Sequence, residues 1–149
     1  MKLVRYGDKG SEKPGIIDEQ GALRDLSAKI ADITPEALTP EGLAALNAID
    51  VGSLPEVTSA PRFGVPVSGI PKIIAIGQNY MNHILEMGYT PPEEPVIFVK
   101  AISSLTGPHD PMIKPKTSTK FDYEVELAAV IGTTAINVLV EDAFDHIAG

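Results

Sequence analysis

Two glutamates lie two residues apart inside an apolar stretch of this chain, residues 121–132. Glu124 and Glu126 flank Val125, and apolar residues follow them up to a Gly-Thr-Thr turn, a pattern that predicts a buried strand. In a strand, residues two apart point to one face about 6.6 Å apart. Buried carboxylates need a common cation, and this spacing suits one hard divalent ion, Mg²⁺, Mn²⁺ or Ca²⁺. The alternative is an edge strand whose glutamates face water.

A histidine and a glutamate three residues apart form the second group that could do chemistry. His83 and Glu86 fall in residues 78–88, which are predicted to form a short helix capped by Asn79 and ended by Gly88. Residues at this spacing share one helix face. A histidine oriented by a carboxylate can take a proton from water as a general base. The alternative is a solvated helix face with no catalytic role.

The remaining histidines are assigned to structure or to the surface. His109 lies in a Gly-Pro-containing turn and is expected to be exposed. His146 closes a helix expected over residues 140–147, where a cation interacts favourably with the helix dipole. Both residues are therefore weaker candidates for catalysis than His83.

The elements that must position these side chains are mostly strands with short helices, which predicts an α+β fold. Strands are expected at residues 2–6, 14–18, 22–26, 72–77, 96–100 and 121–132. Helices are expected from Thr39 to about Ile49, over 78–88, and over 140–147 with Gly149 as its stop. Four prolines and two glycines between residues 54 and 71 indicate a linker or crossover. We therefore predict a small N-terminal α/β domain with its linker at 1–68 and a second, β-rich part at 69–149.

Composition narrows the class of protein. The chain has 149 residues, a net charge of −8 and no cysteine. The acidic balance argues against nucleic acid and against an anionic membrane surface as partners. No apolar run reaches the length of about 20 residues that spans a bilayer, and the start of the sequence lacks the apolar core of a signal peptide. The absence of cysteine excludes disulfides and fits a cytoplasmic protein.

Taken together, these stretches resemble the fumarylacetoacetate hydrolase family. The resemblance rests on residues 76–86 (IGQNYMNHILE), 94–100 (EPVIFVK) and 122–132 (DYEVELAAVIG), supported by 107–111 (GPHDP) and 142–149 (DAFDHIAG). The start, residues 2–7 (KLVRYG) and 12–15 (EKPG), resembles the subgroup described as ureidoglycolate lyase or 2,4-diketo-3-deoxy sugar-acid hydrolase.

The resemblance implies a metal-dependent enzyme. Glu124 and Glu126 correspond to carboxylates that bind Mg²⁺ or Mn²⁺, and His83 with Glu86 to the pair that activates a water. Lys100 and Tyr80 are implied to lie near the substrate. Asp122 shares the face of the glutamates, with a supporting or surface role expected.

The implied reaction is hydrolysis of a carbon–carbon bond in a 2-oxo or 2,4-diketo acid by a cytoplasmic homodimer. Other chemistries implied on the same scaffold are oxaloacetate decarboxylation, hydroxymuconate isomerisation and ureidoglycolate lysis. The alternative outside enzymes is a non-catalytic binding domain. The chain resembles the N-terminal half of family members, whose next strand carries a third metal carboxylate. We therefore expect these residues alone to be inactive, as a fragment or as a chain that another chain completes.

Overall fold

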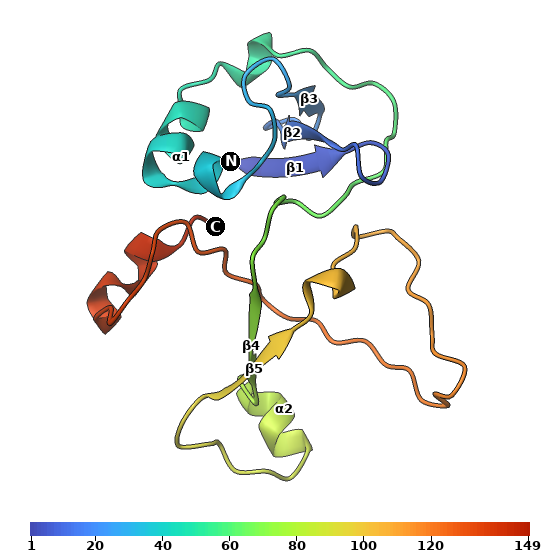
Figure 1. The fold of residues 1–149 in the computed structure, drawn as a ribbon, viewed down its shortest axis with the longest axis vertical. Helices are drawn as coiled ribbons and strands as arrows, with labels where there is room; N and C mark the ends of the chain where they lie inside the picture. Colours follow the sequence, from blue (N-terminus) through green and yellow to red (C-terminus); the bar gives the residue numbers. More distant parts are fainter. The chain divides into compact units, whose positions relative to one another are not determined.

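The structure is a computed structural model that describes all residues from Met1 to Gly149, and it divides into two compact units. The first unit contains Met1–Gly69 and Thr106–Gly149, and the second contains Ile70–Leu105. The second unit is thus inserted, in sequence, between the two parts of the first (Figure 1). None of the helices is both long enough and apolar enough to cross a membrane.

The first unit begins with an antiparallel three-stranded sheet in the order β1-β2-β3. Its strands are β1 (Lys2–Tyr6), β2 (Lys13–Ile17) and β3 (Leu23–Asp25). The predicted strand at the start and the hairpin around residues 19–21 are confirmed. The hairpin turn is held by Asp18, whose carboxylate accepts backbone hydrogen bonds from Gln20 and Ala22 at 3.0 and 2.8 Å. Gly21 has a φ of +86°, which the absence of a side chain permits.

One helix packs against this sheet through Leu46, one of the four residues of its core. Helix α1 (Pro40–Asn47) begins as predicted, because the Thr39 hydroxyl accepts a hydrogen bond from the Gly42 amide at 3.1 Å. The core consists of Ile16, Leu26, Leu46 and Leu54. Two short 3-10 helices flank α1, namely η1 (Pro35–Leu38) and η2 (Val51–Ser53).

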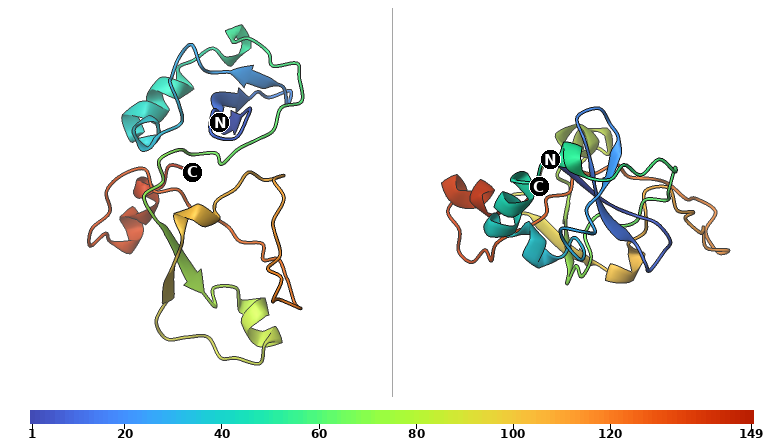
Figure 2. Two further views of the ribbon diagram at one scale, coloured as in Figure 1. Left: turned by 45° about the vertical axis from the view of Figure 1, so that its right-hand side comes forward. Right: turned by 90° about the horizontal axis from the view of Figure 1, so that it is seen from above.

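The second unit is a β-hairpin that carries a helix in its loop (Figures 1 and 2). Strands β4 (Ile73–Gly77) and β5 (Val96–Lys100) pair antiparallel, and helix α2 (Met81–Glu86) lies between them in sequence. A 3-10 helix, η3 (Ile102–Ser104), follows β5. Both predicted strands and the helix are confirmed, and Gly88 ends the helix with a φ of +72°. The predicted cap is wrong: Tyr80 takes this position in place of Asn79, and no side chain caps the helix.

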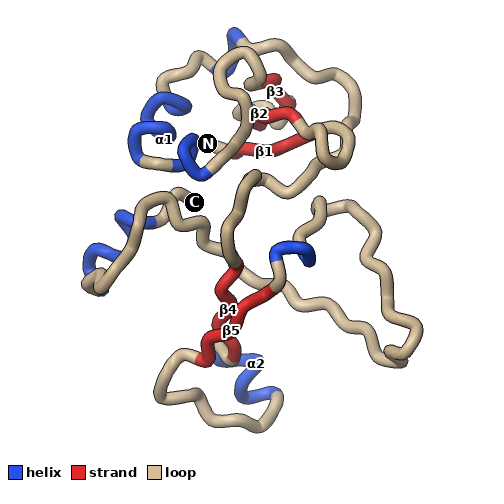
Figure 3. Tube along the Cα trace, in the orientation of Figure 1, coloured by secondary structure: helices blue, strands red, loops and turns tan.

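The largest departure from the sequence prediction is residues 121–132. Residues 121–130 form no strand and are drawn as an extended loop in Figure 3. Val125 and Leu127 are 83% and 91% exposed, so the segment is not buried either. Backbone pairing begins at Val130, which bonds to Ala148 and Gly149, and Ile131 bridges Ile147. A strand is defined by a hydrogen-bond ladder with a neighbouring strand, and residues 121–129 take part in no such ladder.

The last predicted helix is present, but as a 3-10 helix and not as an α-helix. Residues Val140–His146 form the 3-10 helix η4. Ile147 occupies the position after its end, so Gly149 is not the stop that the sequence suggested. Ile147 is instead drawn into the short pairing with Ile131.

Ion pairs in the first unit make its stability depend on pH. The Arg24 side chain, 2.8 Å from Asp18, holds the pKa of that carboxyl below its usual value. Arg62 does the same for Asp110, and hydrogen bonds from the Gly107 amide and the Thr106 hydroxyl lower that pKa further. A lowered pKa gives stabilisation that is complete above the unfolded-state value of about 4 and is lost as pH falls through the folded-state value.

We therefore expect the free energy of unfolding to decrease steadily as pH falls from about 5 toward 2. Urea denaturation at pH 7, 5, 4, 3 and 2.5 measures this, with circular dichroism as the signal. Asp110→Asn serves as the matched variant, and its pH dependence is expected to be shallower than that of the parent. A denaturation midpoint that stays constant down to pH 2.5 contradicts the expectation.

Candidate active site

The predicted acid–base pair lies on helix α2. The Nδ1 atom of His83 is 3.7 Å from the Oε2 atom of Glu86, and their side chains are 64% and 79% exposed. This distance is longer than a hydrogen bond, so the carboxylate faces the ring but does not accept a hydrogen bond from it. Such pairs often tighten when substrate binds. The geometry is that of an exposed, loosely formed dyad.

Local sequence explains why both side chains face solvent. Ile84 is the one buried residue of α2 and therefore marks the packed face of the helix. His83 and Glu86 are displaced from Ile84 by about 100° and 200° around the helix, so neither shares its buried face. The connection from β4 into the helix turns at Gln78, a non-glycine residue with a φ of +51°. A backbone in this left-handed region is often found at functional turns.

Tyr80 and Lys100 occupy opposite ends of the same unit. Tyr80 lies at the start of α2, just beyond the end of β4, and is largely exposed. Lys100 is the last residue of β5 and pairs with Ile73, whereas Gly77, next to the helix, pairs with Val96. Lys100 is thus four strand positions from the helix end of the hairpin, or about 13 Å. The Lys100 ammonium lies 5.9 Å from the centre of the Phe98 ring.

Glu124 and Glu126 belong to the first unit, in the exposed segment 121–130. Each offers carboxylate oxygens, the ligand type that a hard divalent ion prefers. Across all 149 residues, however, no three His, Cys, Asp or Glu side chains gather closely enough to hold a metal. The donor chemistry therefore fits a divalent ion, and the number of side-chain ligands is short of a complete set. Asp122 accepts a hydrogen bond from the Tyr123 amide at 2.9 Å, which suits the supporting role expected of it.

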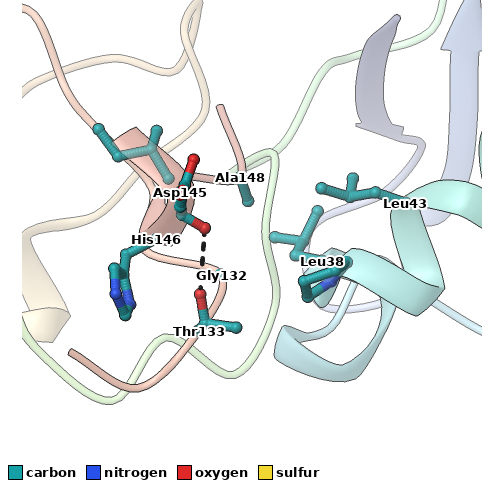
Figure 4. A pocket seen from close by; sticks show the side chains of 9 residues that line it. Leu38, Leu43, Gly132, Thr133, Asp145, His146 and Ala148 are labelled. Atoms are coloured by element: carbon teal, nitrogen blue, oxygen red, sulfur yellow. Dashed lines mark hydrogen bonds between the residues drawn. The ribbon is translucent and has the colours of Figure 1, made fainter. Parts of the chain in front are cut away.

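Two cavities of the first unit contain none of the predicted site residues. One small pocket lies between Leu38, Leu43, Thr133 and His146, and it encloses about 20 Å³, room for one water molecule (Figure 4). The Thr133 hydroxyl donates to the Asp145 carbonyl at 3.5 Å. The Nδ1 atom of His146 is buried without a hydrogen-bond partner, while His109 is exposed as expected.

A second, larger cleft of about 370 Å³ is lined mostly by apolar residues, among them Leu3 of β1, Leu43 of α1, Val130 and Ala148. It offers no acid, base or metal ligand from the predicted set. The predicted site residues therefore lie on α2, on β5 and in segment 121–130, outside both cavities.

A charged network in the first unit was not anticipated from the sequence. Arg62 binds both oxygens of Asp110 at 2.7 Å and reaches Glu12 at 2.8 Å. These residues are 48 and 50 positions apart. Charged residues at such separations leave no local pattern, so periodicity and spacing could not have revealed them.

Comparison with known proteins places these observations in a wider context. Residues 72–149 match the family described as "Fumarylacetoacetate (FAA) hydrolase C-terminal". The matched range contains all six predicted site residues, His83, Glu86, Tyr80, Lys100, Glu124 and Glu126.

Among curated proteins, a 2,4-didehydro-3-deoxy-L-rhamnonate hydrolase of Sphingomonas sp. (strain SKA58) is 50% identical over the whole chain, which corresponds to 50% of that protein. A putative hydrolase of Burkholderia ambifaria is also 50% identical, over 53% of its length. The chain spans about half the length of the curated relatives it matches.

Among solved structures, a fumarylacetoacetate hydrolase of the psychrophilic Exiguobacterium antarcticum superposes with a TM-score of 0.79 at 30% identity. The superposition covers 99% of this chain and 52% of that one. The combination of small sheets and few helices found here is therefore similar to the fold of that hydrolase.

Proposed function

The chain belongs to the fumarylacetoacetate hydrolase family, and from this membership we propose that it serves in the hydrolysis of a carbon–carbon bond in a 2,4-diketo acid. The observation that carries the proposal is the family match over residues 72–149, which spans both predicted groups of reactive side chains. The substrate class is a 2,4-diketo-3-deoxy sugar acid. This choice is supported by 50% identity to a hydrolase named for such a substrate.

His83 and Glu86 are assigned to water activation. Because the Nδ1 atom faces Glu86, the other ring nitrogen is the one available to a water molecule. That nitrogen takes a proton while the water oxygen adds to the C4 carbonyl carbon of the substrate. The bond between C3 and C4 then breaks, C3 keeps the electron pair, and the proton held by His83 passes to C3. One diketo acid and one water yield a 2-oxo acid and a second carboxylic acid.

Glu124 and Glu126 are assigned to a divalent cation, Mg²⁺ or Mn²⁺. When bound, the cation polarises a ketone oxygen of the substrate and stabilises negative charge there. The two carboxylates contribute hard oxygen ligands of opposite charge to the ion. Because two side chains are an incomplete ligand set, we expect the 149 residues by themselves to show no turnover. In this proposal, activity belongs to a protein of the relatives' length that contains them, here called the complete enzyme.

Lys100 and Tyr80 are assigned to substrate binding. A lysine ammonium can pair with a substrate carboxylate, and a tyrosine hydroxyl can donate to a carbonyl oxygen. Their separation along the hairpin suits contacts to different parts of one extended substrate. Assembly as a homodimer belongs to the same proposal and rests on family membership.

A substrate comparison tests the function. The complete enzyme is incubated with acetylpyruvate, oxaloacetate and a 2,4-diketo-3-deoxy sugar acid, each with Mg²⁺ or Mn²⁺, and products are identified by chromatography. We expect pyruvate together with the matching carboxylic acid from the diketo acids, fastest from the sugar acid. If oxaloacetate is the preferred substrate and releases carbon dioxide, the proposed activity is decarboxylation and not hydrolysis. An absence of product from every compound would favour a binding domain.

A further inference from the structure

Five charged side chains of the first unit form one continuous ionic chain. Asp32 receives two hydrogen bonds from Arg5, at 2.7 and 3.0 Å. Glu12 lies 3.7 Å from Arg5 and 2.8 Å from Arg62. Arg62 in turn holds both oxygens of Asp110. The charges alternate along the whole chain, and Glu12 is the link between its two halves.

Asp110, at one end of this network, is held by several hydrogen bonds in addition to its ion pair. Besides Arg62, Asp110 accepts hydrogen bonds from the Thr106 hydroxyl at 2.8 Å and the Gly107 amide at 2.9 Å. Arg62 also donates to the Gly7 carbonyl at 3.2 Å. A Cβ atom on Gly107 would lie 2.2 Å from the Phe63 carbonyl oxygen, so no other residue fits there without a shift of the backbone. The bidentate pairs Arg62–Asp110 and Arg5–Asp32 each fix the orientation of the two side chains as well as their distance.

The network joins the two points at which the chain leaves and re-enters the first unit. The inserted unit is Ile70–Leu105. Before it, Arg5 donates to the Val65 carbonyl at 3.2 Å, and Ser68 bonds to the Ile33 carbonyl through its amide and its hydroxyl. After it, Thr106–Asp110 is held by Arg62. Both ends of the insertion are thus attached to one set of ion pairs that lies wholly within the first unit.

We propose that the chain Asp32–Arg5–Glu12–Arg62–Asp110, here called the stem clasp, is a positioning device that fixes both ends of the inserted unit and thereby orients its acid–base pair. The inference rests on the proposed function, because it takes His83 and Glu86 as the reactive groups of the insertion. Arg62 and Asp110 are positioning residues and touch no substrate. A purely structural alternative is that the same ion pairs only stabilise the N-terminal sheet.

Two substitutions loosen the clasp, and a third provides a matched control. Arg62→Lys keeps the charge but cannot bind Asp110 through two parallel hydrogen bonds. Asp110→Asn removes the charge at the other side of the same contact. Arg24→Lys weakens a different ion pair, Arg24 with Asp18 at 2.8 Å in the β2–β3 hairpin, which is not part of the stem clasp.

Each variant is examined by amide hydrogen exchange and, in the complete enzyme, by steady-state kinetics. We expect Arg62→Lys and Asp110→Asn to raise exchange in Thr106–Asp110 and in the insertion, and to lower kcat at least tenfold with metal affinity within twofold. A misplacement of about 1 Å can cost 100-fold in rate. Arg24→Lys is expected to lower the melting temperature while leaving exchange in the insertion and kcat unchanged.

The two measurements separate failure of the clasp from failure of the proposed function. If the parent enzyme hydrolyses no diketo acid, the function is wrong and hydrogen exchange alone decides the clasp. Exchange in residues 70–105 that equals the parent value in both clasp variants overturns the inference. So does a loss of kcat in Arg24→Lys as large as that in Arg62→Lys.

Discussion

Replacing His83 by alanine is expected to lower kcat of the complete enzyme by about 100- to 10,000-fold, the range typical for loss of a general acid–base group. The side chain is exposed on helix α2, and the one buried residue of that helix is Ile84, so truncation at position 83 leaves the packing intact. Diketo-acid hydrolysis followed by pyruvate detection measures the effect. Affinity for Mn²⁺, measured by calorimetry, should stay within twofold of the parent.

A neighbouring residue controls for damage to the helix. Asn82 is exposed on the same helix, and Asn82→Ala is expected to leave kcat within twofold. Glu86→Gln should fall between the two, because it removes the charge that faces the ring but keeps the base itself. A His83→Ala variant that retains more than a tenth of the parent kcat would remove this residue from the chemistry.

Loss of either Glu124 or Glu126 is expected to weaken Mn²⁺ binding to the complete enzyme at least tenfold, a difference of about 1.4 kcal/mol. Each carboxylate supplies both an oxygen ligand and a charge opposite to that of the ion, so neither is replaced by water without loss. Calorimetric titration of the alanine variants with Mn²⁺ measures the change. Hydrolytic activity should fall in parallel and recover in part at high metal concentration.

Acidic residues elsewhere provide the control for nonspecific charge effects. Glu141 is exposed at the start of η4 and lies outside segment 121–130, so Glu141→Ala should bind Mn²⁺ like the parent. Asp122→Asn should have a small effect, since this carboxylate bonds to the adjacent Tyr123 amide. Equal affinity in the parent, Glu124→Ala and Glu126→Ala would show that the metal, if bound, is held elsewhere.

Elements with local signals were predictable from the sequence. The β2–β3 hairpin follows from the turn chemistry of Asp18 and Gly21, and α1 follows from a threonine cap before a proline. The strands β4 and β5 follow from short apolar runs bounded by turn residues. In each case the residues that decide the structure lie within a few positions of the element.

Features that depend on distant partners were not predictable. Apolar composition at residues 121–132 indicated a buried strand, but composition cannot say whether another strand lies alongside. The stem clasp joins residues about 50 positions apart and left no periodic signal. The helix cap lies at Tyr80, one residue after the expected Asn79, and no side-chain hydrogen bond marks it.

The structure describes the predicted site residues separately in each of the two units. Spacing three along a helix correctly indicated that His83 and Glu86 face each other. Strand register places Lys100 at the far end of the hairpin from this pair, which no spacing rule could show. The roles of all six site residues stay predictions that the substitutions above test.

The separation of Arg62 from Asp110 also bears on the order in which the molecule is assembled during translation. The N-terminal sheet pairs residues at most 15 positions apart (Lys2 with Ile17, 17 − 2) and can form early, because closing short loops is fast. Asp110 follows Arg62 by 48 residues, and at about 5–20 residues per second it is added about 2–10 s later. During that interval Arg62 can already hold Glu12, and β4 can already pair with β5. The clasp therefore closes only after the residues of the inserted hairpin have been made, when that hairpin has had time to form.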